Sequence, residues 1–109
     1  MERRVSMRAQ VDMPISALAF GVRHACRAID ISPAGMVFEQ PRALEERGIS
    51  QVAPFEIYLP SARPIRARGR VVWARKRLLA VKFVWMNDAD RLTLAELLDR
   101  KVRLHEPLH

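Results

Sequence analysis

The chain has 109 residues, enough for one domain and too few for a second domain of ordinary size. Half of the residues are hydrophobic and 28% are charged, which supports one modest core and argues against disorder along the whole chain. The net charge of +7 at pH 7 indicates an anionic partner. Charge alone does not choose between nucleic acid, membrane headgroups and a nucleotide.

Targeting signals and metal-ligand clusters are not evident in the sequence. No apolar run approaches the roughly 20 residues of a membrane-spanning helix, and the polar start Met1-Glu2-Arg3-Arg4 is unlike a secretory signal. We therefore expect a cytoplasmic protein with no membrane span. Cys26 is the single cysteine, and we expect a small buried thiol in a strand. His24, His105 and His109 are too scattered for a metal site.

Alternation of apolar and polar residues dominates the sequence as far as residue 85 and predicts half-buried β-strands. The apolar faces of the four clearest runs are Val11, Met13 and Ile15; Phe55, Ile57 and Leu59; Ile65, Ala67, Gly69, Val71 and Trp73; and Leu79, Val81, Phe83 and Trp85. Both tryptophans are therefore expected in the core. Arg66, Arg68 and Arg70 face the opposite way, as a solvated strand face or as a contact for a partner or a phosphate. The short link 74–77 between the last two runs predicts a hairpin.

The period of the pattern changes after the strands. Asn87 is a suitable N-cap residue, and Asp88 and Asp90 favour the first turn of a helix. Leucines and a valine then recur at helical spacing, and a further helical turn is expected over 43–47, ended by Gly48. The sum is about six short strands followed by one amphipathic helix. Six strands in so short a chain close best as an antiparallel β-barrel, because closure removes exposed sheet edges.

Two short motifs carry the candidate chemistry. The first is Arg4-Val5-Ser6-Met7-Arg8, an R-x-x-x-R directly preceded by Arg3. The second is Asp30-Ile31-Ser32-Pro33-Ala34-Gly35, a D-x-S-x-x-G at the end of a predicted strand. In this order, spacing and strand context, the two motifs resemble the PilZ domain family. The resemblance runs from Arg3 to about Arg100.

The resemblance implies a mostly all-β fold, which is a six-stranded antiparallel PilZ-type β-barrel with a C-terminal α-helix. It also implies that this domain binds cyclic di-GMP. It implies a flexible N-terminal arm at 1–10, a barrel with its helix at 11–103 and a tail at 104–109. In the family, the arm wraps around the ligand, a role that transfers to Arg4 and Arg8. Asp30 and Ser32 take the place of the residues that lie under one guanine. An arginine at the position of Arg3 favours an intercalated pair of ligand molecules.

The residue types suit this ligand on chemical grounds. Guanine presents O6 and N7 as adjacent acceptors, which a guanidinium grips in bidentate fashion. Its opposite edge presents N–H donors, which require a carboxylate or hydroxyl acceptor. Asp30 and Ser32 are two apart on a strand and so project from one face, while Ile29 and Ile31 turn into the core. Gly35 permits a positive φ or a close approach of ligand to backbone.

Other interpretations remain open at this stage. Asp30 and Ser32 also suit plain turn chemistry before Pro33. No phosphate-binding loop, Ser/His/Asp set or metal cluster is evident, so we expect a binding protein without cofactor and not an enzyme. The signal would then pass to an unidentified downstream protein. Two alternatives are an adaptor of the same fold that does not respond to nucleotide, and a basic barrel for single-stranded nucleic acid. The second is disfavoured because stacking requires exposed aromatic residues.

Overall fold

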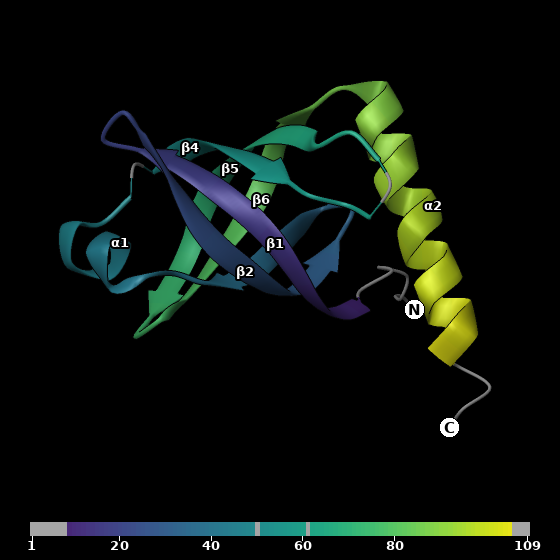
Figure 1. The fold of residues 1–109 in the computed structure, drawn as a ribbon, viewed down its shortest axis with the longest axis horizontal. Helices are drawn as coiled ribbons and strands as arrows, with labels where there is room; N and C mark the ends of the chain where they lie inside the picture. Colours follow the sequence, from purple (N-terminus) through teal and green to yellow (C-terminus); the bar gives the residue numbers. More distant parts are fainter. Residues whose placement is uncertain (1–8, 50, 61, 106–109) are drawn as a thin grey trace.

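The computed structural model describes residues 9–49, 51–60 and 62–105, which form six strands and two helices (Figure 1). In chain order these elements are β1 (Ala9–Ala19), β2 (Val22–Ser32), β3 (Gly35–Glu39), α1 (Arg42–Arg47), β4 (Val52–Ile57), β5 (Ile65–Arg75), β6 (Leu78–Met86) and α2 (Asp88–His105). The strands pair antiparallel in the order β1-β2-β3-β6-β5-β4 and close into a barrel. The predicted six-stranded barrel with a C-terminal helix is therefore confirmed. The barrel begins at Ala9 and the helix extends to His105, so both pass the predicted limits of 11 and 103.

Two tight reversals set the register of the longest hairpins. Phe20 and Gly21 both have positive φ, of 56° and 74°, between β1 and β2. Lys76 has a φ of 55° between β5 and β6, where the sequence predicts a hairpin. A left-handed residue lets the backbone reverse with the twist that paired strands require.

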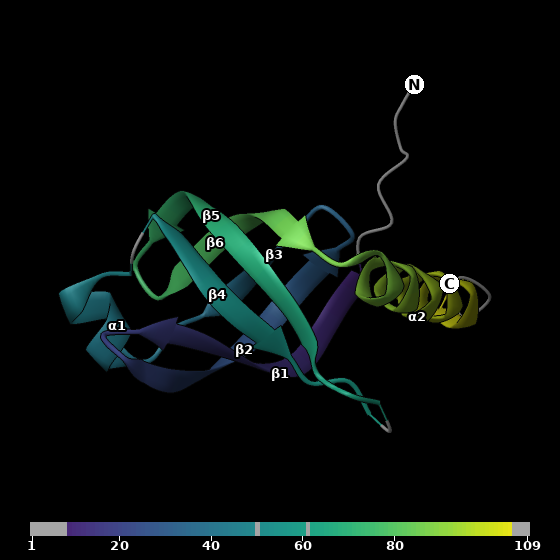
Figure 2. The same ribbon diagram turned by 90° about the horizontal axis from the view of Figure 1, so that it is seen from above.

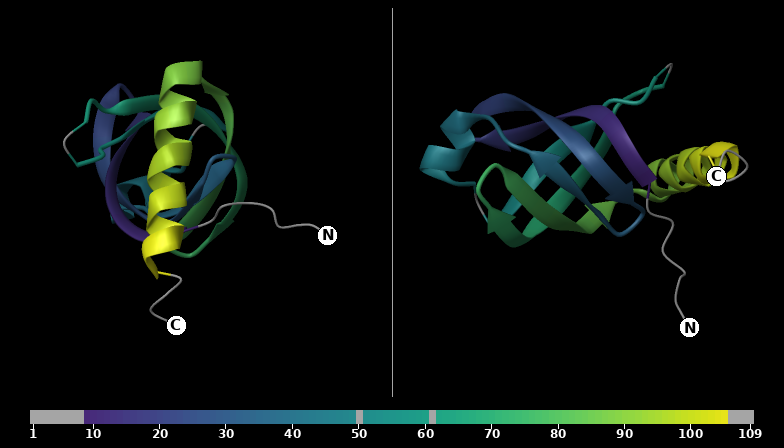
Figure 3. Two further views of the ribbon diagram at one scale, coloured as in Figure 1. Left: turned by 90° about the vertical axis from the view of Figure 1, so that its right-hand side faces the viewer. Right: turned by 90° about the horizontal axis from the view of Figure 1, so that it is seen from below.

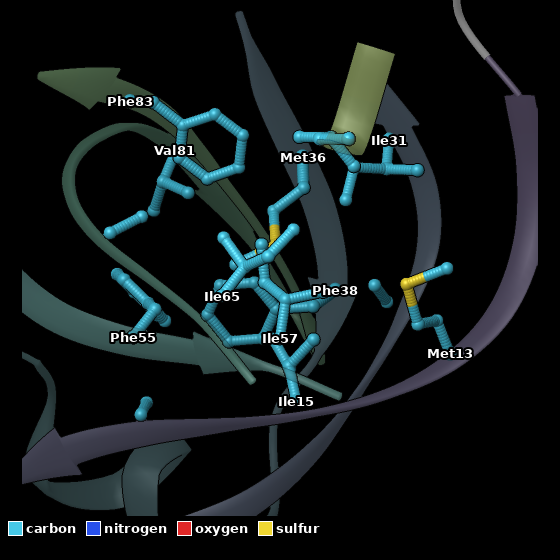
Figure 4. Close-up of a cluster of buried hydrophobic side chains, with 14 of the residues drawn as sticks. Met13, Ile15, Ile31, Met36, Phe38, Phe55, Ile57, Ile65, Val81 and Phe83 are labelled. Atoms are coloured by element: carbon cyan, nitrogen blue, oxygen red, sulfur yellow. The ribbon is translucent and has the colours of Figure 1, made fainter. Parts of the chain in front are cut away.

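The barrel interior is filled by the inward faces of all six strands (Figure 4). Phe38 and Phe55 lie at its centre, edge to face, with ring centroids 5.5 Å apart. Around them lie Met13, Ile15, Ile31, Met36, Ile57, Ile65, Val81 and Phe83. Each large apolar side chain buried in this way contributes roughly 1.5–3 kcal/mol of transfer free energy.

The two helices lie at opposite ends of the barrel (Figures 1 and 2). The helix α2 crosses one mouth, where Leu94 and Leu98 are fully buried (Figure 3). The Asn87 side chain accepts a hydrogen bond from the backbone N–H of Asp90 at 2.7 Å, which confirms the predicted N-cap. At the other end α1 buries Leu44. No helix in the described part of the chain has the length and hydropathy needed to cross a membrane.

The prediction that both tryptophans lie in the core is wrong. Trp73 is 44% exposed and Trp85 is 49% exposed. In β6 the extra residue Val84 stands between Phe83 and Trp85, because their partners in β5 are consecutive. A bulge of one residue inverts the alternation beyond it, so Met86 turns inward in place of Trp85.

A second bulge explains Trp73. Val71 pairs with Val81 and Trp73 pairs with Ala80, so Val72 is the extra residue of β5. Trp73 therefore follows the outward face of the strand instead of the inward face of Val71.

A third bulge lies in β2, at Ile29. Ala28 pairs with Phe38 while Asp30 pairs with the preceding residue of β3, Val37. Ala28 fills the core position, and Ile29 is only half-buried, contrary to the prediction. Ile31 is buried as predicted.

Gly35 lets β3 approach β6. A Cβ atom at Gly35 would overlap the carbonyl oxygen of Val81 and would lie 3.2 Å from the Cα of Lys82. Its φ lies outside the left-handed region. Of the two reasons predicted for a glycine here, the positive φ is therefore wrong, and the close approach of a ligand stays a prediction. The contact with β6 is a further reason that the sequence did not indicate.

We expect Gly35→Ala to lower the free energy of unfolding by about 1–3 kcal/mol, because the added methyl group must push the β3 and β6 backbones apart. Urea denaturation followed by circular dichroism measures the change. Ala34→Ser, at the exposed neighbouring position of the same turn, is the control and should leave the midpoint unchanged. Equal midpoints for the two variants would contradict this account.

Candidate functional site

The three residues of the second motif meet at one small pocket on the outer surface of the barrel. Asp30 and Ser32 come from the end of β2, and Gly35 begins β3. The pocket has a volume of about 140 Å³. Its lining is completed by Met36, Val37, Ala80 and Val81. The structure therefore brings these sequence-predicted site residues together, at the junction of β2, β3 and β6.

Strand register extends the outer face of this pocket across to β5. Asp30 pairs with Val37, Val37 pairs with Ala80, and Ala80 pairs with Trp73. Residues that pair directly across antiparallel strands project from the same face and lie about 4.5–5.5 Å apart at Cβ. The row therefore begins with a carboxylate, crosses two small apolar side chains and ends at an exposed indole.

A second row runs beside the first. Ser32 pairs with Gly35, Gly35 pairs with Lys82, and Lys82 pairs with Arg70. Lys82 and Arg70 are both exposed. The outer face thus carries acceptor groups at its β2 end and an aromatic ring with two cations at its β5 and β6 end. Such a face suits a ligand that combines negative charge with flat, hydrogen-bonding rings.

Sequence reasoning missed Trp73 and Lys82 as members of this face. Simple alternation places Trp73 inside, and only the bulge at Val72 turns it outward. The sequence gives no signal for that bulge, because Val72 is as apolar as its neighbour Val71. Arg70 belongs to the predicted outward stripe, and its exposure is confirmed.

Ser32 also holds the turn between β2 and β3. Its Oγ accepts hydrogen bonds from the backbone N–H groups of Ala34 at 3.1 Å and Gly35 at 3.2 Å. The turn chemistry considered as an alternative for Ser32 is therefore present. These bonds fix the hydroxyl at the rim of the pocket, so any ligand contact to it shares an oxygen that already accepts two backbone donors.

The first motif lies outside the described residues, and with it the predicted roles of Arg3, Arg4 and Arg8. The point where that segment joins the barrel is defined. Ala9 pairs with Ile31, and Gln10 pairs with Asp30. The polypeptide that precedes Ala9 is therefore attached beside the pocket.

Cys26 is a half-buried thiol of β2, and burial raises its pKa from 9.0 to about 11. Its Sγ donates a hydrogen bond to the carbonyl oxygen of His24 at 3.4 Å. A thiol with so high a pKa stays protonated at neutral pH and is a poor nucleophile. Among the residues that the structure describes, no group of three or more His, Cys, Asp or Glu side chains gathers as a metal site.

Comparison with solved structures gives several matches to the fold. The first is the inhibitor of motility MotI/DgrA from Bacillus subtilis, with a TM-score of 0.76 and 17% identity over 95% of this chain and 53% of the other. The PilZ domain of YcgR from Escherichia coli with c-di-GMP matches with a TM-score of 0.64 and 14% identity over 98% of each chain. The PilZ domain of CeSA from a cellulose-synthesizing bacterium matches with a TM-score of 0.61 and 13% identity, over 84% of this chain and 94% of that one.

These identities are low enough that the structural matches speak for the fold alone. The chain spans about half the length of MotI/DgrA. No curated protein matches the sequence significantly. The family model for the PilZ domain matches residues 2–100, which is most of the sequence and includes both motifs. The chain therefore belongs to the PilZ domain family.

Proposed function

We propose that this protein is a cytoplasmic receptor for cyclic di-GMP that passes its signal to another protein. The observation that carries the proposal is the pocket that gathers Asp30, Ser32 and Gly35, beside which the segment with Arg4 and Arg8 joins the barrel. Membership of the PilZ family and the c-di-GMP in the YcgR structure support the same ligand.

The chemistry of the outer face matches the two kinds of group in this ligand. The Asp30 carboxylate is an acceptor for the N1–H and 2-amino donors of a guanine, with the Ser32 hydroxyl two residues away. Lys82 and Arg70 place positive charge within reach of a phosphate. The exposed indole of Trp73 offers a stacking surface for a base, at the far end of the row that begins with Asp30.

The N-terminal arginines complete the site in this proposal. Arg4 and Arg8 grip guanine acceptors or phosphates, and ligand capture orders their segment against the barrel. Arg3 favours two intercalated ligand molecules in place of one. The new surface created by the ordered segment is then the signal that a downstream protein detects.

Binding without turnover is part of the same proposal. Hydrolysis of a phosphodiester needs an activated water or nucleophile and stabilisation of the developing charge, commonly by metal ions. The single thiol is protonated at neutral pH, and the described residues hold no cluster of metal ligands. We therefore propose a receptor and not an enzyme.

Calorimetric titration with cyclic di-GMP tests the proposal, and we expect saturable heat at micromolar ligand. Asp30→Ala should weaken binding by about 1.5–3 kcal/mol, through loss of a charge-assisted hydrogen bond. A molar ratio near two ligands per chain would support the intercalated pair, and a ratio near one would contradict it.

Glu39→Ala is the matched control for that titration, because it removes an exposed carboxylate from the neighbouring strand β3, outside the pocket. Its affinity should equal that of the unmodified protein. Absence of heat with the unmodified, folded protein would instead favour the alternative adaptor that does not respond to nucleotide.

Tryptophan fluorescence tests the predicted position of the base. The chain has two tryptophans, so Trp85→Phe leaves Trp73 as the sole reporter and Trp73→Phe leaves Trp85. We expect cyclic di-GMP to quench the emission of Trp73 strongly because a stacked base contacts the indole. The emission of Trp85, on the row at the other end of β5, should change little. Equal responses of the two reporters would exclude stacking on Trp73.

A further inference from the structure

A second hollow lies on the outer surface of the barrel and shares no residue with the Asp30 pocket. It has a volume of about 470 Å³ and is lined by residues of β2, β4, β5 and β6. Its lining consists of Arg23, Pro54, Phe55, Glu56, Arg66, Ala67, Arg68 and Trp85. We call this hollow the Arg68 groove.

Strand register places an apolar and cationic row across the middle of this groove. Trp85 pairs with Arg68, and Arg68 pairs with Pro54. The bulge residue Val84, next to Trp85, is 44% exposed. A large aromatic ring, a proline and a guanidinium are thus presented to solvent side by side. Tryptophan and arginine are the side chains most enriched at the energetic centres of protein interfaces.

The charges of the groove are arranged around one carboxylate. Glu56 has a side chain only 14% exposed and forms ion pairs with Arg23 at 3.1 Å and with Arg66 at 3.5 Å. The Tyr58 hydroxyl donates a further hydrogen bond to Glu56 at 2.9 Å. The charge of Glu56 is thereby balanced within the protein, while the side chains of Arg23 and Arg66 remain 48% and 77% exposed at the groove wall.

Arg68 differs from the other two arginines of the groove. Among the described residues, no carboxylate lies within ion-pair distance of it. The groove therefore holds three arginines against one carboxylate, and the exposed guanidinium of Arg68 retains its full capacity to bind an anion. A partner with complementary charge is acidic.

The closed barrel restricts how such a partner binds. At Ala67 and Arg68, in the middle of the groove, β5 is paired with β4 on one side and with β6 on the other, so no free strand edge is available there. Recognition at this face must therefore use side chains. A polyphosphate chain suits the groove less well than an acidic peptide does, because the exposed Val84 beside Trp85 offers contact only to an apolar group.

We propose that the Arg68 groove docks an acidic segment of a partner protein. In this arrangement a carboxylate of the partner binds Arg68, with a second near Arg66. A large apolar side chain of the partner packs between Trp85 and Pro54. The inference rests on the proposed function in that it takes the downstream protein as the partner. It deepens that proposal by assigning a docking surface and a chemistry to this partner. The groove and the nucleotide pocket are tested separately.

Selection of short random peptides displayed on phage, against the immobilised full chain, identifies the chemistry that the groove accepts. We expect enrichment of peptides that combine Asp or Glu with one aromatic or large aliphatic residue. Synthetic versions of these peptides, followed by fluorescence anisotropy, should bind with an affinity that falls as salt is raised. Enrichment without acidic residues would overturn the proposal, as would tighter binding of oligodeoxythymidine to the same groove.

Charge reversal distinguishes the groove from general attraction to a basic protein. Arg68→Glu should weaken binding of the selected peptides by roughly tenfold or more, and Trp85→Ala by a similar factor. Arg75→Glu makes the same change of charge at an exposed position of β5 outside the groove and should have little effect. Equal losses for Arg68→Glu and Arg75→Glu would overturn the proposal. Thermal unfolding verifies that each variant is folded. If the Arg68→Glu variant does not fold, the Trp85→Ala variant tests the groove.

Titration of the Arg68→Glu variant with cyclic di-GMP separates the two proposals. We expect the variant to bind cyclic di-GMP normally although it no longer binds the selected peptides. This result would show that the substitution affects the groove alone. Specific peptide binding by a protein that gives no heat with nucleotide would overturn the proposed function and leave the groove standing.

Discussion

Closure of the sheet is the constraint on which the rest of this structure depends. The six strands close into one barrel in which every strand has a paired neighbour on each side, so little of the backbone is left as a free sheet edge. The interior is filled by side chains packed around Phe38 and Phe55. Recognition is consequently confined to the outer faces of the strands and to the segments attached to them. Which side chain points outward at each position therefore decides the function.

Four register shifts interrupt the pairing of the described strands, and three of them adjust the outer face beside a candidate binding residue. Ile29, Val72 and Val84 are each one residue in excess of the partner strand, and each inverts the alternation that follows. The bulge at Ile29 precedes Asp30, and the bulges at Val72 and Val84 precede Trp73 and Trp85. All three therefore adjust the outer face at a candidate binding residue, in keeping with the occurrence of bulges at functional sites.

Much of the fold was predictable from the sequence because most strands contain a stretch in which apolar and polar residues alternate. Ile65, Ala67 and Gly69 face the core as their period of two predicts. The Asn87 cap and the β5–β6 hairpin follow equally local rules. The grouping of Asp30, Ser32 and Gly35 was predictable because a motif of six residues spans a single turn.

The remaining features depend on contacts between strands that are distant in sequence. Exposure of the two tryptophans follows from extra residues that are visible only when the partner strand is known. The same is true of Gly35, whose missing side chain makes room for the backbone of β6. The Arg68 groove combines residues of four strands, and no short stretch of sequence signals it.

The pairing of Ala9 with Ile31 has a thermodynamic consequence for ligand capture. Groups on a segment tethered beside a pocket meet a ligand there in an intramolecular step, at an effective concentration of order millimolar for a short flexible link. In the proposed receptor, arginine contacts that would be negligible between separate molecules would then contribute to affinity. They would close after the ligand has arrived, so they would slow its dissociation more than they speed its association. In the proposed receptor, the short stretch of sequence that separates Arg4 from β1 would therefore set how long the ligand stays bound.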